Sequence, residues 1–391
     1  MRRYYRGCDM QRILSVAEMA SLARHRLPGF AWEYLQGGAE DEITLQRNRA
    51  IFSRYELQGR TLVPNDPPEL ATTLVGTPSR LPMAIGPSGF NGMLWPGADI
   101  ELARTAAAQG IPFTLSTVAN ASMEDVRAQV PDVDLWFQLY ALKAPELEKD
   151  LLDRAIRSGC STLVVTSDAL VVGNREWDRR NFASPRDLTL RNKLDVLAHP
   201  GWLWRVMVPG GLPTMGNLDP YLPEGERTAL GAMQFIAEQL DTRLDWTRLA
   251  AIRARWPGKI ILKGVMHPDD ALAAIALGLD GLVISNHGGR QLDGVCSSLE
   301  ALARIAPLAK GKISLLLDSG IRRGADIVKA LALGAEGVLL ARATLYGVAA
   351  GGASGAGRVL DILDQELVRC LNLMGCTGIA ALDKHWLHSN V

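Results

Sequence analysis

Short apolar runs that end in small or polar residues recur along the chain, and such runs are typical of buried parallel strands. Eight of them occur, over residues 83–86, 113–117, 135–140, 162–168, 260–265, 281–286, 314–320 and 337–342. Helical patterns lie between them, over 99–109, 145–158, 268–277 and 324–333. The patterns over 145–158, 268–277 and 324–333 are each followed by a glycine, as helices often are. Ser122 with Asp125 predicts the start of a further helix.

Eight strand–helix units, most of them about 25 to 30 residues apart, predict a (β/α)8 barrel over about 81–350. An open doubly wound sheet is the alternative, but eight evenly spaced units favour closure. Helical patterns near 15–24 and 29–37 predict an N-terminal cap over one barrel end, and 357–374 reads as a final helix.

About ninety residues separate the fourth predicted strand from the fifth, so we expect a long insertion over about 175–240. A loop of that length is usually functional or mobile. The whole chain, 1–391, is expected to be a single domain.

Polar residues follow every predicted strand at its C-terminal end, which is where barrel enzymes carry their functional residues. The ionisable ones are Asp168, Lys263, His287, Asp318 and Arg342. A barrel without a site has no need of these groups, because burying them without partners costs free energy. We therefore expect one active site at this end.

The loop after the sixth strand, Ser-Asn-His-Gly-Gly-Arg-Gln-Leu-Asp over 285–293, carries His287 and Arg290 three residues apart. Histidine is the side chain most often used as a general base, and a guanidinium binds a carboxylate at two points. A base and a carboxylate clamp on one loop suggest oxidation of a small hydroxy acid.

The last two strands are followed by a candidate phosphate site. Residues 318–324 and 340–342 supply glycine, backbone N–H groups and the guanidinium groups of Arg322 and Arg342, and this is the usual phosphate position in such barrels. The alternative is that Arg322 and Arg323 only face solvent. The sequence has no GxGxxG between strand and helix, no GxxxxGK[ST] and no HExxH or other metal cluster. A phosphate-bearing cofactor in a barrel therefore points to flavin mononucleotide (FMN).

The amino-acid composition limits the partners and the cellular locations that we expect for the protein. Lys plus Arg and Asp plus Glu both number 42, which gives no basic field for nucleic acid. No run of eighteen apolar residues is present, and no apolar stretch typical of a signal peptide follows the N-terminal arginines. The five cysteines are scattered and form no CxxC pair, which favours a reduced, cytoplasmic setting.

With these residues identified, the chain resembles the FMN-dependent α-hydroxy acid dehydrogenase/oxidase family from about residue 27 to residue 375. The segments that carry the resemblance are 285–293, DSGIRRGADIVKALALGA over 318–335, and YLQGGAEDE over 34–42. The segments NGMLWP (91–96), DLWFQLY (134–140) and RATLYG (342–347) look most like the mandelate-oxidising branch. The resemblance implies oxidation of an (S)-2-hydroxy acid to the 2-oxo acid, with electrons passed to a quinone, another acceptor or oxygen.

The resemblance also implies roles for individual residues. The residues implied for substrate and proton are His287 as base, Asp168 as its partner, Arg175 and Arg290 as carboxylate ligands, and Tyr34 and Tyr140 as hydrogen-bond partners. Lys263 is implied to lie beside the flavin N1/O2 edge, where its charge favours the reduced ring. The remaining cofactor positions are Pro87, Ser88, Gly89, Ser116, Gln138, Thr166 and Ser285 for the ring, Asp318 for the ribityl chain, and Gly320, Arg322, Ala341 and Arg342 for the phosphate.

Three positions depart from much of the family. Ala341 stands where glycine is common, and a positive φ there would cost roughly 1 kcal/mol. Val118 replaces a tryptophan found in some relatives, which leaves room for a bulky, mandelate-like substituent. Gly89 replaces an alanine beside the flavin, which changes the packing there.

Residues 199–213 form an amphipathic, partly basic segment with Trp202, Trp204 and Arg205, so the insertion is a candidate for peripheral contact with the inner face of a membrane. In the mandelate-oxidising branch the corresponding region binds membranes. The alternative is an active-site lid.

Other functions stay open from sequence. The main alternative is an L-lactate dehydrogenase or oxidase; weaker ones are an FMN-barrel isomerase without net redox change and a catalytically silent flavin-binding protein. Analogy with the family suggests a homo-oligomer, often a tetramer. No haem-binding domain is expected before the barrel.

Overall fold

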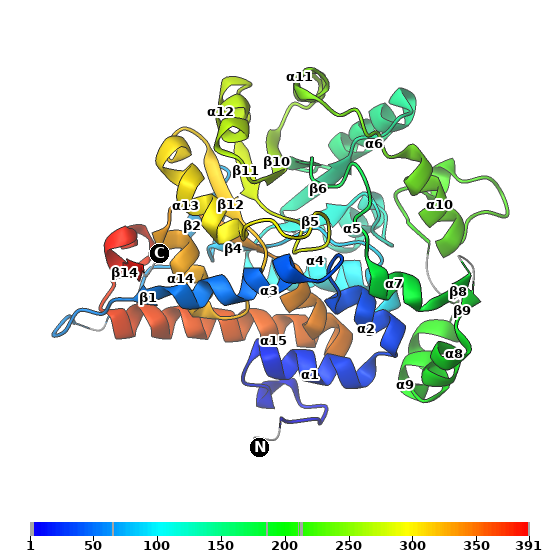
Figure 1. Cartoon of the computed structure of the whole chain (residues 1–391), viewed down its shortest axis with the longest axis horizontal. Coiled ribbons are helices and arrows are strands. Elements are labelled where there is room, and N and C mark those ends of the chain that lie inside the picture. The colour runs from blue at the N-terminus through cyan, green and yellow to red at the C-terminus, as the bar shows by residue number, and fades with distance from the viewer. Residues whose placement is uncertain (1–3, 65, 185–186, 210, 212–213, 390–391) are drawn as a thin grey trace.

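The computed structural model describes residues 4–64, 66–184, 187–209, 211 and 214–389, and a closed barrel of eight parallel strands forms its centre (Figure 1). The strands are β4 (Met83–Ile85), β5 (Phe113–Ser116), β6 (Leu135–Tyr140), β7 (Thr162–Thr166), β10 (Lys259–Val265), β11 (Gly281–Ile284), β12 (Ser314–Leu317) and β13 (Gly337–Leu340). They follow one another around the barrel in chain order, and β13 pairs with β4 to close it. The predicted (β/α)8 barrel is confirmed.

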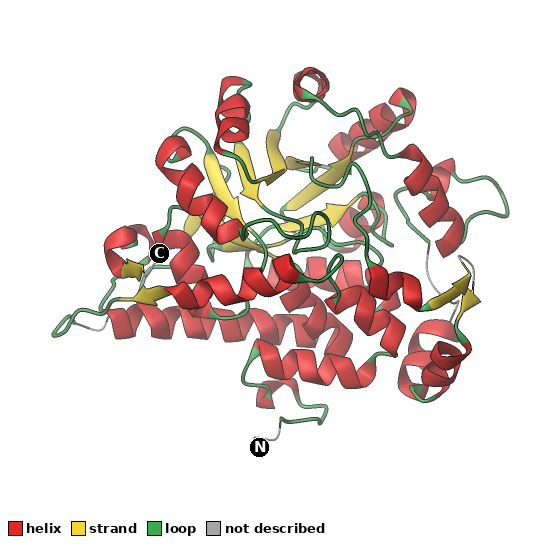
Figure 2. Cartoon of the chain, viewed as in Figure 1, coloured by secondary structure: helices red, strands yellow, loops and turns green. Residues whose placement is uncertain are grey.

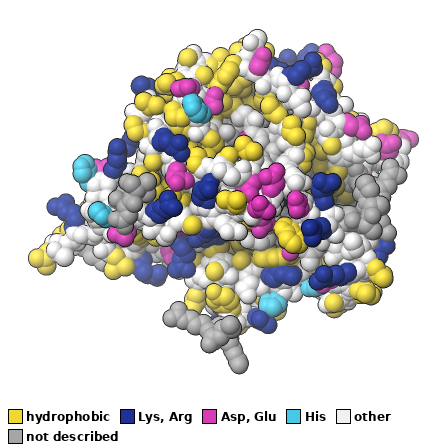
Figure 3. Space-filling view, viewed as in Figure 1, with side chains coloured by type: hydrophobic (Ala, Val, Ile, Leu, Met, Phe, Trp, Pro, Cys, Tyr) yellow, Lys and Arg dark blue, Asp and Glu magenta, His cyan; other side chains and the backbone are white. Residues whose placement is uncertain are grey.

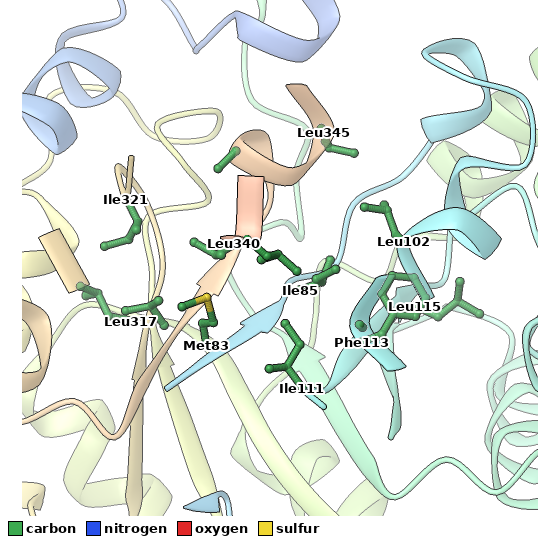
Figure 4. Close-up of a cluster of buried hydrophobic side chains, with 14 of the residues drawn as sticks. Met83, Ile85, Leu102, Ile111, Phe113, Leu115, Leu317, Ile321, Leu340 and Leu345 are labelled. Atoms are coloured by element: carbon green, nitrogen blue, oxygen red, sulfur yellow. The ribbon is translucent and has the colours of Figure 1, made fainter. Parts of the chain in front are cut away.

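The barrel strands are mostly apolar because each of them is buried on both faces, and most of their polar residues lie near the strand ends. Met83, Ile85, Phe113 and Leu115 face outward into the core shared with the helices (Figure 4). The alternate positions face inward. They form a separate interior cluster of Ala84, Trp136, Val164, Ile261, Val283, Leu316 and Leu339, joined by Leu74 and Val75. The last two belong to a hairpin of β2 (Thr72–Leu74) and β3 (Thr77–Ser79), which was not predicted.

Helices surround the barrel, as Figure 2 shows. They are α4 (Ala98–Gln109), α5 (Met123–Gln129), α6 (Pro145–Arg157), α11 (Trp246–Arg255), α12 (Pro268–Ala276), α13 (Ser298–Ala309), α14 (Gly324–Ala332) and α15 (Arg342–Met374). Ser122 caps α5 through a hydrogen bond from the Asp125 amide, as predicted. The final helix is longer than the predicted 357–374. A kink at Gly351 and Gly352 divides it, and a Cβ on Gly352 would lie 3.0 Å from the Trp95 ring.

The N-terminal cap consists of α1 (Val16–Arg26), α2 (Gly29–Gln36) and α3 (Ile43–Ala50), with short 3-10 turns at Met10–Arg12 and Ile51–Arg54. Figure 1 shows α1 and the long α15 side by side beneath the barrel, and they pack against each other. After α3, β1 (Tyr55–Leu57) pairs with the C-terminal β14 (Leu387–Ser389), so the C-terminal strand is fixed to the segment that follows the N-terminal cap.

The insertion between β7 and β10 is mostly helical. Its elements are α7 (Glu176–Arg180), β8 (Phe182–Ser184), β9 (Asp187–Leu188), α8 (Leu190–Leu197), α9 (Pro200–Trp202), a π-turn (Leu203–Met207), a 3-10 turn (Asp219–Tyr221) and α10 (Ala229–Gln239). Figure 1 places α8, α9 and the small β8–β9 hairpin at the edge of the molecule, away from the barrel axis.

The two tryptophans of the predicted membrane segment have different environments. Trp202 is 4% exposed; its indole N–H donates to the Met93 carbonyl at 2.9 Å, and its ring packs edge-on against Phe30. Trp202 therefore fixes the insertion to the body of the protein. Trp204 is 74% exposed, while Arg205 lies over the Trp95 ring. Residues 210, 212 and 213 of the predicted segment lie outside the described residues.

Candidate active site

The predicted site residues converge at the C-terminal ends of the barrel strands. With the exception of Asp168 and Ser285, all of them line one cavity, together with Leu35, Gly86, Val118, Gly288, Ser319, Ile321, Leu339, Leu340 and Leu345. Asp168 and Ser285 contact lining residues directly: Asp168 is bonded to His287, and Ser285 accepts hydrogen bonds from the Lys263 ammonium and the His287 amide. The site therefore includes residues from every barrel strand or the loop after it.

His287 and Asp168 form a largely buried pair with 2.8 Å between Nδ1 and Oδ1. Burial lowers the pKa of His287, and the nearby positive charges of Lys263 and Arg175 add to this, while Asp168 opposes it. Burial alone would raise the pKa of Asp168, but the facing His287 and the charge of Lys263 hold it below its usual value. The pair is therefore an ionised carboxylate beside a neutral imidazole, which is the form that can accept a proton.

The loop that carries His287 has an unusual backbone. His287, Gly288 and Gly289 are consecutive left-handed residues, with φ of 56°, 68° and 74°. A side chain in this conformation costs about 1–3 kcal/mol and persists only where neighbours impose it. The helix α3 packs closely against this loop, and a Cβ on Gly289 would lie 2.6 Å from the Leu45 amide nitrogen. Position 289 therefore requires glycine.

Lys263 lies at the floor of the cavity and is almost completely buried. Its ammonium donates to Ser285 Oγ at 3.0 Å and lies 3.1 Å from Asp318 Oδ2. Burial would lower the pKa of Lys263, but the charges of Asp318 and Asp168 outweigh burial and raise it above the ordinary value. Lys263 is therefore a fixed positive charge inside the barrel mouth.

A chain of side-chain hydrogen bonds crosses three neighbouring strands at the same end. Ser116 Oγ donates to Gln138 Oε1 at 2.8 Å, and the Gln138 amide donates to Thr166 Oγ1 at 3.0 Å. These contacts fix the orientation of the Gln138 amide, so the cavity presents a defined set of donors and acceptors.

Two arginines occupy the outer part of the cavity. Arg290 Nη1 donates to the carbonyls of Tyr34 and Gly37 at 2.8 and 2.7 Å, and its guanidinium lies over the Tyr34 ring. Arg175 donates to the Arg290 carbonyl and to the Gln291 side chain. Burial, and next the charge of Arg175, lowers the pKa of Arg290 to about 10. Two neighbouring cations held by neutral carbonyls form a site for an anionic ligand.

Two aromatic hydroxyls face the same space. The Tyr34 hydroxyl donates to the Gly89 carbonyl at 3.0 Å. Burial, together with the charge of Asp168, raises the pKa of Tyr140 to about 12, so its hydroxyl remains a donor at neutral pH.

At the phosphate end of the predicted site, Arg322 and Arg342 form no ion pair with a carboxylate of the described residues. Arg342 donates to three backbone carbonyls, of Leu35, Gly37 and Gly288. Burial, followed by the charge of Arg290, lowers the pKa of Arg342 to about 9. Arg322 lies over the Tyr346 ring close by. A bound phosphate would neutralise this charge, so the residues present fit FMN.

The expected strain at Ala341 does not occur. Its φ is −116°, so no positive φ has to be tolerated at this position. The left-handed residues of this region are Ser319 and Gly320 instead, and a Cβ on Gly320 would lie 2.1 Å from the Asn48 carbonyl oxygen in α3.

Several residues at the site were not assigned from sequence. Asn286 forms a reciprocal buried pair of 2.8 Å hydrogen bonds with Asn48. Asp293 accepts hydrogen bonds from the Ile43 and Thr44 amides, so the loop after β11 caps the start of α3. Asn286 and Asp293 lie in the segment 285–293, but their partners are some 240 residues away. Asp178 lies 3.7 Å from Arg290. The sequence around Asp178 is rich in arginine, and nothing in it indicates that the distant Arg290 is a neighbour of Asp178.

Comparison with known proteins agrees with this geometry. The model of a family described as FMN-dependent dehydrogenase matches residues 23–389. The chain belongs to this family, and it is an FMN-dependent oxidoreductase.

Individual members of the family are similar to this chain over almost its whole length. The chain is 41% identical to (S)-mandelate dehydrogenase of Pseudomonas putida over 382 residues, which is 97% of this chain and 95% of the relative. It is 40% identical to an L-lactate dehydrogenase of Ectopseudomonas mendocina, over 95% of this chain and 97% of that one. A crystal structure of (S)-mandelate dehydrogenase, described as a monotopic membrane protein, superimposes with a TM-score of 0.92 at 40% identity, covering 97% of this chain and all of the other.

Proposed function

We propose that this protein binds FMN in the cavity as a single-domain enzyme and oxidises an (S)-2-hydroxy acid to the corresponding 2-oxo acid. The observation that carries the proposal is the arrangement of a neutral histidine, held by an ionised aspartate, next to two partly buried arginines in one cavity. A base beside a carboxylate-binding site matches a substrate that carries its reacting C–H next to a carboxylate.

In the proposed reaction Arg175 and Arg290 bind the substrate carboxylate, and Tyr34 and Tyr140 donate to it or to the hydroxyl. His287 accepts a proton from the substrate, either from the α-carbon or from the hydroxyl as hydride leaves, through Nε2, the ring nitrogen not bonded to Asp168. Asp168 stabilises the imidazolium that forms, because its charge lies 2.8 Å away. When bound, FMN accepts the two electrons that leave the α-carbon.

The residues proposed to hold FMN are those that line the inner part of the cavity. Lys263 is a positive charge suited to an electron-rich flavin ring, and Asp318 is placed for the ribityl chain. Ring contacts are proposed for Pro87, Ser88, Gly89, Ser116, Gln138, Thr166 and Ser285, and phosphate contacts for Gly320, Arg322, Ala341 and Arg342.

A bulky, mandelate-like substituent is the proposed substrate feature. Val118 lines the cavity next to Gly89, so this wall is formed by two small residues. The relative named (S)-mandelate dehydrogenase supports the same choice. L-Lactate is the second candidate, because relatives named L-lactate dehydrogenase are as similar in identity.

We further propose that the enzyme associates with the inner face of a membrane through the insertion and passes electrons to a quinone. In α8, Leu190, Leu194 and Leu197 are all exposed on one helix, and Trp204 is exposed close by. Figure 3 shows hydrophobic side chains at the surface in this corner, beside Lys and Arg side chains. Apolar side chains next to basic ones suit an anionic lipid surface. No helix in the described part of the chain has the length and hydropathy to cross a bilayer.

Another acceptor, or oxygen, is the alternative to the quinone. Assembly into a homo-oligomer, with a tetramer as the first candidate, is proposed by analogy with the family alone.

The proposal is tested by mixing the purified yellow protein anaerobically with (S)-mandelate, L-lactate and longer 2-hydroxy acids while flavin absorbance is recorded. Rapid bleaching by the (S)-enantiomer of at least one of them is expected. Reoxidation by oxygen and by a quinone analogue is then compared. Flavin that stays oxidised with every 2-hydroxy acid would show that the proposed function is wrong.

A further inference from the structure

Asp178 places a carboxylate beside Arg290, one of the arginines proposed to bind the substrate carboxylate. It belongs to α7, the first element of the insertion, and lies three residues after Arg175. Its Oδ2 atom is 3.7 Å from Arg290 Nη2, and both side chains are largely buried. Asp178 and a bound carboxylate would therefore share one guanidinium.

The contact acts through charge and not through orientation. A separation of 3.7 Å is too long for a hydrogen bond. Arg290 is already held by the carbonyls of Tyr34 and Gly37, which accept from Nη1 at 2.8 and 2.7 Å. Removing the Asp178 charge would leave both of these bonds in place.

The neighbouring arginines compensate the negative charge of Asp178 only in part. Burial raises the pKa of Asp178, although the positive charges of Arg290, Arg175 and Arg342 oppose the shift. Glu33 in α2, which packs against α7, adds further negative charge, and its own pKa is raised by burial and partly by Asp178. A second carboxylate arriving at Arg290 would be repelled across a short distance in a partly desolvated site.

We propose that Asp178 is a specificity-determining residue that limits the affinity of the site for carboxylates; this inference rests on the function proposed above. Its negative charge opposes the binding of substrate and of 2-oxo acid product equally, because both present the same carboxylate to Arg290. Uncharged ligands are not affected. The residue thereby keeps product release from becoming slow in a site with several buried cations.

The test measures the dissociation constants of benzoylformate and of its primary amide, from the change in flavin absorbance of the oxidised holoenzyme. The variants are Asp178→Asn, which removes the charge, Asp178→Glu, which restores it, and Glu176→Gln, which removes an exposed charge from the same helix. Asp178→Asn should bind benzoylformate about three- to tenfold more tightly than wild type. Asp178→Glu and Glu176→Gln should stay within about twofold of wild type, and the affinity for the amide should be the same in all proteins.

Unchanged or weaker benzoylformate binding by Asp178→Asn would overturn the inference, as would an equal gain for the amide. FMN content reports folding, and Asp178→Ser provides a second charge-free variant. Loss of FMN in both would assign Asp178 a structural role and overturn the inference as well. A wild-type protein that neither binds benzoylformate nor is reduced by any 2-hydroxy acid contradicts the proposed function itself, so the two failures are distinguishable.

Discussion

His287 Nδ1 lies 2.8 Å from one oxygen of Asp168, and the other oxygen of that buried carboxylate, Oδ2, has no hydrogen-bond partner among the described residues. The carboxylate of Asp168 thus interacts with His287 through a hydrogen bond and with the nearby charge of Lys263. This relationship leads to the first two predictions.

Asp168→Asn should retain FMN and reduce the rate of flavin reduction by about 10- to 100-fold. The neutral amide keeps the shape of the side chain but no longer stabilises the imidazolium that forms in the reaction. Stopped-flow reduction under nitrogen measures the rate, and flavin content provides the control. A rate within about twofold of wild type would mean that the carboxylate has no part in proton transfer.

The pH dependence follows from the lowered pKa of His287, whose ordinary value is 6.5. Only the neutral ring accepts a proton, so the second-order rate constant of reduction should be constant from pH 7 up to the range in which Arg342 and Arg290, with pKa values of about 9 and about 10, lose their charge. It should fall as the pH drops through a midpoint below 6.5. Since Asp168 raises this pKa, Asp168→Asn should move the midpoint lower still. A midpoint above 7 in the free wild-type enzyme would contradict the neutral resting histidine.

Gly89 and Val118 are packed too closely for a larger residue at position 89. A Cβ on Gly89 would lie 2.4 Å from Val118 Cγ2 and 3.0 Å from the Val118 carbonyl oxygen. Gly89→Ala should therefore destabilise the protein by about 1–3 kcal/mol and lower FMN occupancy. Adding Val118→Ala should recover much of this loss, which thermal unfolding would measure. A double variant no more stable than Gly89→Ala would show that the clash is not with this side chain.

The exposed face of the insertion predicts the effect of two substitutions on membrane binding. Leu194→Ser with Trp204→Ser should lower binding to anionic vesicles by about tenfold, because both side chains are exposed and apolar. Co-sedimentation measures the bound fraction. Leu373→Ser, at an equally exposed leucine near the C-terminal end of α15, is the control and should change nothing. Equal binding of all three proteins would place membrane contact elsewhere or exclude it.

The barrel was predictable because its strands are buried on both faces and therefore read as apolar runs with polar ends, as 135–140 and 281–286 do. The β2–β3 hairpin was not, since its role depends on Leu74 and Val75 filling the barrel interior. The kink in α15 likewise depends on the distant Trp95. Such contacts are set by tertiary packing and leave no local pattern.

The site residues that stand at the ends of strands could be predicted from the sequence. The contacts that these residues make with other segments of the chain could not. Trp202 and Trp204 look alike in sequence, yet one is buried against Met93 and Phe30 and the other is exposed. Similarly, the link between Asp293 and α3 joins segments that are about 250 residues apart.

The central claim, that His287 is the base of an FMN-dependent oxidation, is tested most directly by comparing wild type with His287→Gln in anaerobic flavin reduction. Both proteins should be yellow with equal FMN content. The wild type should be bleached by the (S)-2-hydroxy acid that reduces it fastest, while the variant should be slower by about 100-fold or more. A variant that retains FMN and is reduced at the wild-type rate would contradict the account.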